Sequence, residues 1–134
     1  MGLDQNETPS FFKFESLDIY HKALDFCHAV SILSNDCSND AQRLVVNRFF
    51  DEALKIVTNI SEGSTGTKNL FSVSLQQAKS AIDNCVLFCS LAARHNLINA
   101  EKEVFFRNAL MEMTKMIVAL IVSLQKHDPI DSLL

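Results

Sequence analysis

The segment from residue 71 to residue 92 carries apolar or small side chains at alternating intervals of four and three residues. These positions are Phe71, Leu75, Ala78, Ile82, Cys85, Cys89 and Ala92. An average spacing of 3.5 residues keeps the side chains on one side of an α-helix and predicts a left-handed wrap around neighbouring helices. The pattern therefore favours a helical bundle over any arrangement of strands.

The segment from Asn99 to about Lys126 repeats this spacing and predicts a second helix of the same kind. Its seam positions are Phe106, Leu110, Met113, Ile117, Leu120 and Leu124. Asn99 is a suitable N-cap, and Asn96, which tolerates the left-handed conformation, is a suitable C-terminal cap for the helix before it. Asp128 and Pro129 end the last helix.

Two further amphipathic helices are predicted in the N-terminal half. The first is capped by Ser16 and runs to about Ser34, and the second runs from near Asp40 to Gly63. Their apolar positions are Leu17, Ile19, Tyr20, Ala23, Leu24, Phe26, Cys27, Val30 and Leu33, then Val46, Phe49, Phe50, Ala53, Val57 and Ile60. We interpret Gly63 as a C-terminal cap, because glycine takes the left-handed conformation at little cost. Thr67 then caps the third helix.

Connections of roughly five residues or fewer join the four helices, and short connections place consecutive helices antiparallel. The predicted fold is therefore all-α, an antiparallel up-down-up-down left-handed four-helix bundle. A chain of 134 residues forms one such domain. We expect a flexible tail over residues 1–13, the bundle over 14–127 and a C-terminal tail over 128–134.

Charge and cysteine usage bear on the class of protein. Twelve Lys and Arg against 16 Asp and Glu give a net charge of −4, which argues against a protein that coats nucleic acid. The chain has four cysteines and no N-terminal export segment, which predicts a reduced, cytoplasmic location. Cys85 and Cys89 have a spacing that suits either two core side chains or a metal pair. The apolar run over 116–122 is too short to span a membrane.

The fourth helix carries more apolar residues than its seam uses. A second stripe, flanked by Arg107 and Lys115, faces away from the predicted core and consists of Val104, Met111, Val118 and Val122. Such a strip with charged margins is typical of an interface, so we expect a homo-oligomer. The alternative is an ordinary surface on which single apolar side chains are exposed.

No motif for nucleophilic, di-iron or phosphate-loop chemistry occurs, so we expect no catalytic residues, no cofactor and no enzymatic activity. The nearest approach to a metal motif is a line of four residues on the first helix, Asp18, His21, Asp25 and His28. These form either a solvated polar face or a regulatory metal site. On the third helix, Lys68, Lys79 and Arg94 form either a solvated face or a set of phosphate contacts.

Two stretches resemble a known family. Residues 14–23, FESLDIYHKA, resemble the opening Phe-x-x-Leu-x-x-aromatic-x-x-Ala of the four-helix-bundle proteins encoded by intervening sequences in bacterial 23S ribosomal RNA genes. Residues 56–63, IVTNISEG, are similar to that family's Ile-Pro-Ser-Asn-Ile-Ala-Glu-Gly signature, and Phe71, Leu75 and Ala78 match its next block. The resemblance covers residues 14 to 126, nearly the whole chain.

The resemblance implies a bacterial bundle that often assembles as a ring of five and has no known catalysis. A related branch resembles the accessory protein of diversity-generating retroelements, a basic pentamer that binds a reverse transcriptase and nucleic acid. This chain departs from the pattern at Phe50 and Asp51, where the family often has two arginines, and at Val57, where it has proline. The second stripe and the absence of a catalytic motif indicate an oligomeric scaffold with a protein partner. The alternative, which rests on the resemblance and on the basic residues of the third helix, is an accessory protein that binds RNA or a reverse transcriptase.

The signature residues Asn59, Ile60, Glu62 and Gly63 are interpreted as mainly structural. We expect the Asn59 amide to bind the loop that follows its helix. Glu62 places an anion near a helix C-terminus, where the dipole disfavours it, so we expect a cationic or backbone N–H partner for its carboxylate.

Overall fold

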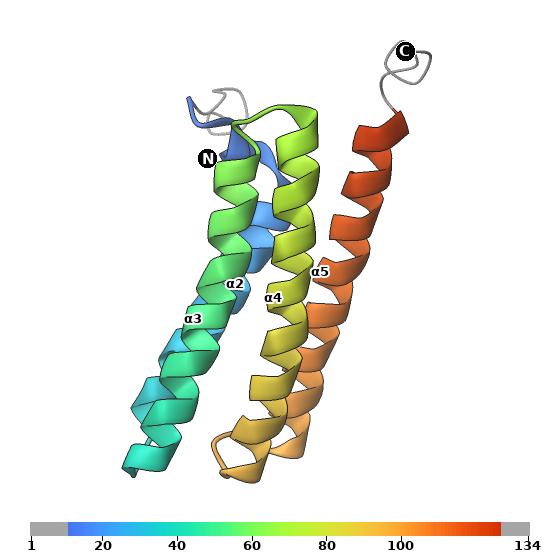
Figure 1. The fold of residues 1–134 in the computed structure, drawn as a ribbon. Coiled ribbons are helices and arrows are strands. Elements are labelled where there is room, and N and C mark those ends of the chain that lie inside the picture. Colours follow the sequence, from blue (N-terminus) through green and yellow to red (C-terminus); the bar gives the residue numbers. More distant parts are fainter. Residues whose placement is uncertain (1–10, 127–134) are drawn as a thin grey trace, which may run out of the picture.

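A computed structural model describes residues 11–126 of the chain, and these residues form helices and connections without any strand. The four α-helices are α2 (Asp18–Ser31), α3 (Asp40–Gly63), α4 (Lys68–Arg94) and α5 (Ala100–Lys126). Two 3-10 helices, η1 (Lys13–Ser16) and η2 (Ile32–Asp36), precede and follow α2. Figure 1 shows the α3–α4 connection at one end of the molecule and the α4–α5 connection at the other. The predicted tail residues 1–10 and 128–134, with Asp128 and Pro129, lie outside the described residues.

The helix boundaries follow local capping chemistry. The side chains of Asn39, Thr67 and Asn99 accept hydrogen bonds from backbone N–H groups three residues later, at 2.8, 3.2 and 2.8 Å. Asn96 has a φ of 61° and ends α4, as predicted. The Leu97 N–H donates to the Ala92 carbonyl at 2.9 Å and the Asn96 N–H to the Ala93 carbonyl at 3.1 Å, which is the Schellman pattern.

The predicted N-cap of the first helix is wrong. Ser16 lies in η1, and its hydroxyl donates to the Lys13 carbonyl at 2.8 Å instead of accepting from the helix. Helix α2 begins at Asp18, one residue later than a cap at Ser16 would place it, and Leu17 before it provides no side-chain cap. Its far end also differs from the prediction, because the α-helix stops at Ser31 and continues as η2.

All seven predicted seam positions of α4 are buried, and so are the first four of α5. Leu120 and Leu124, the last two of α5, are only half-buried, and Ile121 is buried in their place. A straight helix drifts by about 20° per heptad from a strict seven-residue repeat, which moves the buried line toward Ile121. Two apolar positions of the N-terminal helices also differ from the prediction: Leu24 of α2 is exposed and Phe50 of α3 is half-buried.

Three phenylalanine rings form the centre of the core. Phe26 of α2, Phe49 of α3 and Phe106 of α5 lie with ring centroids 5.6 to 6.0 Å apart, within the range of favourable aromatic pairs. Helix α4 contributes mostly small buried side chains beside them, among them Ala78, Ala81, Cys85, Cys89 and Ala92. Helix α4 also contributes one large ring, the half-buried Phe88, which stacks on Phe49 with the ring centroids 6.4 Å apart.

A buried glutamine connects two helix ends at one end of the molecule. The Gln42 carbonyl oxygen accepts from the Ser38 N–H at 2.7 Å and from the Ser38 hydroxyl at 3.0 Å, and its amide donates to the His95 carbonyl at 2.8 Å. The side chain thus satisfies a carbonyl at the C-terminal end of α4 that the helix itself leaves free. This link between α3 and α4 spans 53 positions and has no local signal in the sequence.

Gly63 does not have the left-handed conformation that we predicted, since no glycine in the described chain has a positive φ. It is the last residue of α3 and is buried. A Cβ atom added there would lie 2.4 Å from the Ser74 Cβ and 3.2 Å from a ring carbon of Phe71, both on α4. The glycine is required because the two helices approach too closely at this point for any side chain.

We predict that Gly63→Ala lowers the free energy of unfolding by about 1–3 kcal/mol, because the added methyl group overlaps Ser74. Gly63→Asn should be more destabilising still, whereas a left-handed cap would accept asparagine. Chemical denaturation followed by circular dichroism measures both changes. The matched control is Gly66→Ala, whose Cβ would lie 3.3 Å from the exposed Leu70 and at an ordinary contact distance of 3.6 Å from the Gly63 carbonyl oxygen, so its change should stay under about 1 kcal/mol. A Gly63→Asn protein as stable as wild type would contradict the packing explanation.

Candidate interaction surfaces

The four residues of the predicted second stripe lie on the outer side of α5. Val104, Met111, Val118 and Val122 are 56, 51, 42 and 41% exposed. The spacing of seven, seven and four residues aligns them over about 27 Å of helix at 1.5 Å per residue. No described residue covers this α5 stripe, which places four exposed apolar side chains in one line along the helix.

The charged residues beside the α5 stripe differ in their partners. The Arg107 guanidinium donates to a Glu103 carboxylate oxygen at 3.2 Å and to the Ser90 hydroxyl at 2.7 Å. Lys115 is exposed and forms no ion pair with any residue of the described chain, although its charge helps lower the pKa of Glu112. The α5 stripe therefore carries one ammonium group that is free to pair with an incoming partner.

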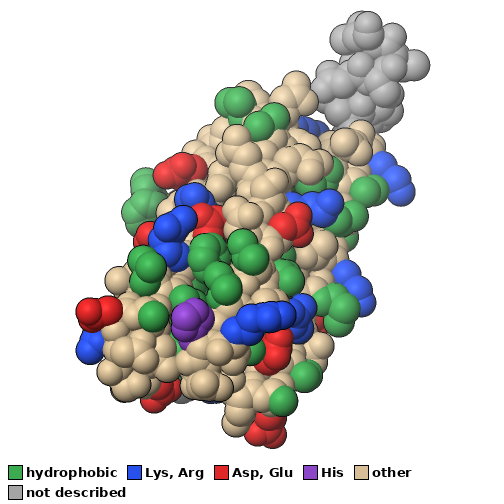
Figure 2. Space-filling view, turned by 60° about the horizontal axis from the view of Figure 1, so that its bottom comes forward, with side chains coloured by type: hydrophobic (Ala, Val, Ile, Leu, Met, Phe, Trp, Pro, Cys, Tyr) green, Lys and Arg blue, Asp and Glu red, His purple; other side chains and the backbone are tan. Residues whose placement is uncertain are grey.

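The three predicted nucleic-acid contacts lie on α4, but they are widely spaced. Lys68 and Arg94 are exposed at the two ends of the helix, about 39 Å apart at 1.5 Å per residue, and Lys79 is half-buried between them. On the face drawn in Figure 2, Lys and Arg side chains alternate with Asp and Glu, and hydrophobic side chains lie in small groups between them. That face shows no continuous basic area.

The four polar residues predicted on the first helix are all exposed on α2. The His21 ring donates from Nε2 to the Glu15 carbonyl at 2.6 Å, which connects α2 to η1. No group of three or more His, Cys, Asp or Glu side chains within residues 11–126 is arranged to hold a metal ion. Of the two readings of Asp18, His21, Asp25 and His28, their placement favours the solvated polar face.

The signature residues make different contacts from those we predicted. The Asn59 amide donates back to the Lys55 carbonyl of its own helix at 2.8 Å and not to the following loop. Glu62 is exposed, and its carboxylate has no hydrogen bond or ion pair within the described chain. Water solvates an exposed carboxylate well enough that no protein partner is needed. Ile60 and Gly63 are both buried, so these two signature residues serve the packing of α3 against its neighbours.

Three of the four cysteines are part of the core. Cys27, Cys85 and Cys89 are buried, and burial raises the pKa of each thiol, with the negative charge of Glu52 adding to the effect at Cys85. A metal needs the thiolate form, which this environment disfavours. Cys37 is half-buried after η2, and its thiol lies 3.7 Å from the Leu33 carbonyl oxygen.

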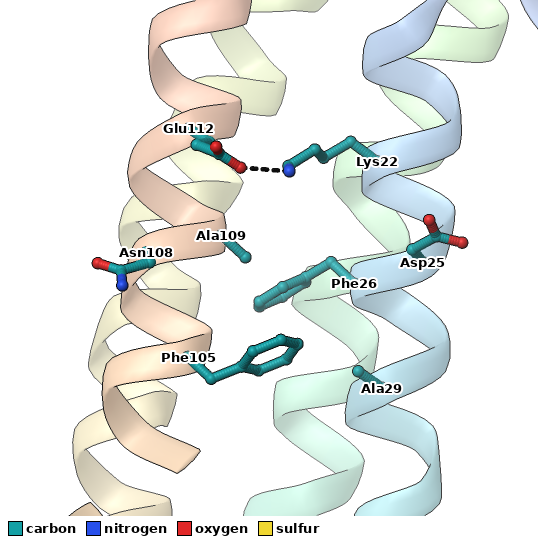
Figure 3. Close-up of a pocket in the computed structure, with 8 residues that line it drawn as sticks. All are labelled: Lys22, Asp25, Phe26, Ala29, Phe105, Asn108, Ala109 and Glu112. Carbon is teal, nitrogen blue, oxygen red and sulfur yellow. Dashed lines mark ion pairs between the residues drawn. The ribbon is translucent and has the colours of Figure 1, made fainter. Parts of the chain in front are cut away.

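A groove between α2 and α5 was not predicted from the sequence. It has a volume of about 310 Å³, and the two helices contact each other much less than the other neighbouring pairs do. Phe26 and Ala29 of α2 and Phe105 and Ala109 of α5 form its apolar walls, and Figure 3 shows both rings directed into the space between the helices. Phe105 is 57% exposed, although it neighbours the buried Phe106.

Charged side chains border this α2–α5 groove. Lys22 of α2 and Glu112 of α5 form an ion pair across it (Figure 3), and this contact lowers the pKa of Glu112. Asp25 lies on the α2 flank, is exposed and has no ion pair or hydrogen bond with the described residues. The sequence signal that could have indicated the groove is Phe105 itself, a large apolar residue outside both the predicted seam of its helix and the second stripe.

Comparison with known proteins adds no relative: no protein-family model matches the chain, and no curated protein matches it. Among residues 11–126, each helix is either too short or too polar to cross a lipid bilayer. The resemblance described above stays a prediction. The residues of the two apolar surfaces are therefore the basis for assigning a function.

We predict that one thiol per folded chain, Cys37, reacts rapidly with a maleimide at pH 8. The other three should stay unlabelled, because they are buried and their raised pKa keeps them protonated. Mass spectrometry of the native and the denatured protein measures this as one adduct against four. In the Cys37→Ser protein the rapid adduct should disappear, whereas Cys89→Ser should retain it. Rapid labelling of two or more thiols in the folded wild type would contradict the assignment.

Proposed function

We propose that the protein is a non-catalytic oligomeric scaffold, in which the α5 stripe forms an interface between copies of the chain. The exposure of four apolar side chains in one line of α5 carries this proposal. Leaving apolar surface in water costs free energy that association recovers, at roughly 25 cal/mol per Å² of buried apolar surface. Large exposed apolar patches on folded proteins mark interaction sites for that reason.

The proposal includes the finer architecture predicted from the sequence, an up-down-up-down left-handed bundle. It is supported by the short connections between consecutive helices, since α4 begins five residues after α3 ends and α5 begins six residues after α4 ends. Membership in the intervening-sequence family, a ring of five copies and a location in the bacterial cytoplasm are also part of the proposal. They are supported by the resemblance of residues 14–23 and 56–63.

The alternative, an accessory protein that binds RNA or a reverse transcriptase, has less support. The basic residues of α4 are spread over its whole length, and the chain has a net charge of −4. Light scattering with a structured RNA at low and high salt separates the two functions. An increase in mass that disappears at high salt would favour the RNA-binding alternative.

We predict that Val118→Glu weakens self-association by a factor of about 100 or more, because the interface would then bury an unpaired carboxylate. Light scattering should show the wild type as a discrete oligomer and the variant closer to the 15.0 kDa single chain. The matched control is Val73→Glu, the same change at an exposed valine of α4, 54% exposed and outside the stripe. The proposal is wrong if Val118→Glu leaves the mass unchanged, or if the wild type is a monomer.

A further inference from the structure

Helix α5 has two uncovered apolar surfaces, one on each side. The α5 stripe lies on the side of α4, where Met111 and Arg107 border Ile82, Asp83 and Val86. The α2–α5 groove lies on the other side. The stripe is a row of side chains projecting from a single helix, whereas the groove is a hollow between two helices. The two surfaces therefore differ in shape as a ridge and a trough.

Each of the two surfaces has unpaired charges at its border. At the groove, Lys22 and Glu112 neutralise each other and leave the carboxylate of Asp25. At the stripe, Arg107 is paired with Glu103, whereas the ammonium group of Lys115 and, on the α4 border, the carboxylate of Asp83 have no ion pair within the described chain. The unpaired anion of the groove, Asp25, is therefore complementary to one unpaired group of the stripe, the Lys115 cation. Complementary charges of this kind select a partner and its orientation.

We propose that the α5 stripe of one copy binds in the α2–α5 groove of the next copy. The inference rests on the proposed self-association and adds the surface that receives the stripe. Contact between two different surfaces of the same chain is head-to-tail, and it produces a ring when the rotation between copies closes. In such a contact Phe105 and the stripe valines become buried together, and Lys115 pairs with Asp25 of the neighbouring copy.

Pairing of the stripe with itself is less favourable. A two-fold contact would use the stripe of both copies and leave the α2–α5 groove and Phe105 exposed to water, so it would cover less of the exposed apolar surface.

Two single variants and their mixture test the head-to-tail contact. Val118→Glu disables the stripe, and Phe105→Glu places a carboxylate in the groove at a residue exposed enough to be changed without disturbing the core. Each variant alone should be monomeric. Mixed in equal amounts they should form a heterodimer, because the intact stripe of Phe105→Glu can bind the intact groove of Val118→Glu.

Light scattering and native mass spectrometry measure these species, and circular dichroism melting establishes that each variant is folded. Leu87→Glu is the matched control for the groove, because Leu87 is 56% exposed on α4, away from both surfaces. That variant should retain the wild-type mass. A Phe105→Glu protein that assembles as the wild type does, or a mixture that stays monomeric, overturns the head-to-tail contact. A monomeric wild type would overturn both the head-to-tail contact and the proposed function.

Discussion

The contact of Phe26, Phe49 and Phe106 determines how the other elements are arranged. The three rings come from α2, α3 and α5, and each lies within about 6 Å of the other two. Because interiors pack to nearly crystalline density, the large rings restrict the size of the other side chains in the core. Helix α4 contributes the ring of Phe88, stacked on Phe49, and otherwise mostly alanines and cysteines. Truncating a ring of this kind typically costs about 3–5 kcal/mol, which shows how far a domain of this size depends on such a centre.

The small side chains of α4 have a further consequence for the surface. They allow α3 and α4 to approach closely along their length, and Gly63 and Ser74 come into contact at the end of the pair. Between α3 and α4, burial raises the pKa of Glu52, but the hydrogen bonds from Lys55 of α3 and Asn84 of α4 and the positive charge of Lys55 outweigh it. The pKa of Glu52 is therefore lowered. Helices α2 and α5 have no equivalent close contact. Their facing alanines, Ala29 and Ala109, leave unfilled the groove that Phe26 and Phe105 border. The positions of small and large side chains thus explain why α3 and α4 pack closely whereas α2 and α5 leave a groove.

Most features that depend on neighbours in the sequence were predicted well, although the cap at Ser16 was not. The caps at Thr67, Asn96 and Asn99 use backbone groups within a few residues, and the α4 seam depends only on helical periodicity. Features that depend on another helix were missed or misread. A glycine at the end of a helix is typical of a cap, but Gly63 is required because Ser74 of α4 lies against it. The hydrogen-bond partner of Gln42 lies 53 residues away in the sequence. The exposure of the stripe was predicted, whereas the groove requires knowing how far α2 and α5 are separated.

The interior of the described chain contains no buried polar side-chain atom without a hydrogen-bond partner. Every buried side-chain nitrogen and oxygen of residues 11–126 has a hydrogen-bond partner, so no unpaired buried group there favours binding a small polar molecule. Exposed apolar side chains remain on the outside, among them those of the α5 stripe and Phe105. Covering either surface lowers the free energy of the system, and covering both at once requires contact between two copies or two partners. The proposed head-to-tail contact would cover both surfaces with one kind of chain, which is why we propose self-assembly.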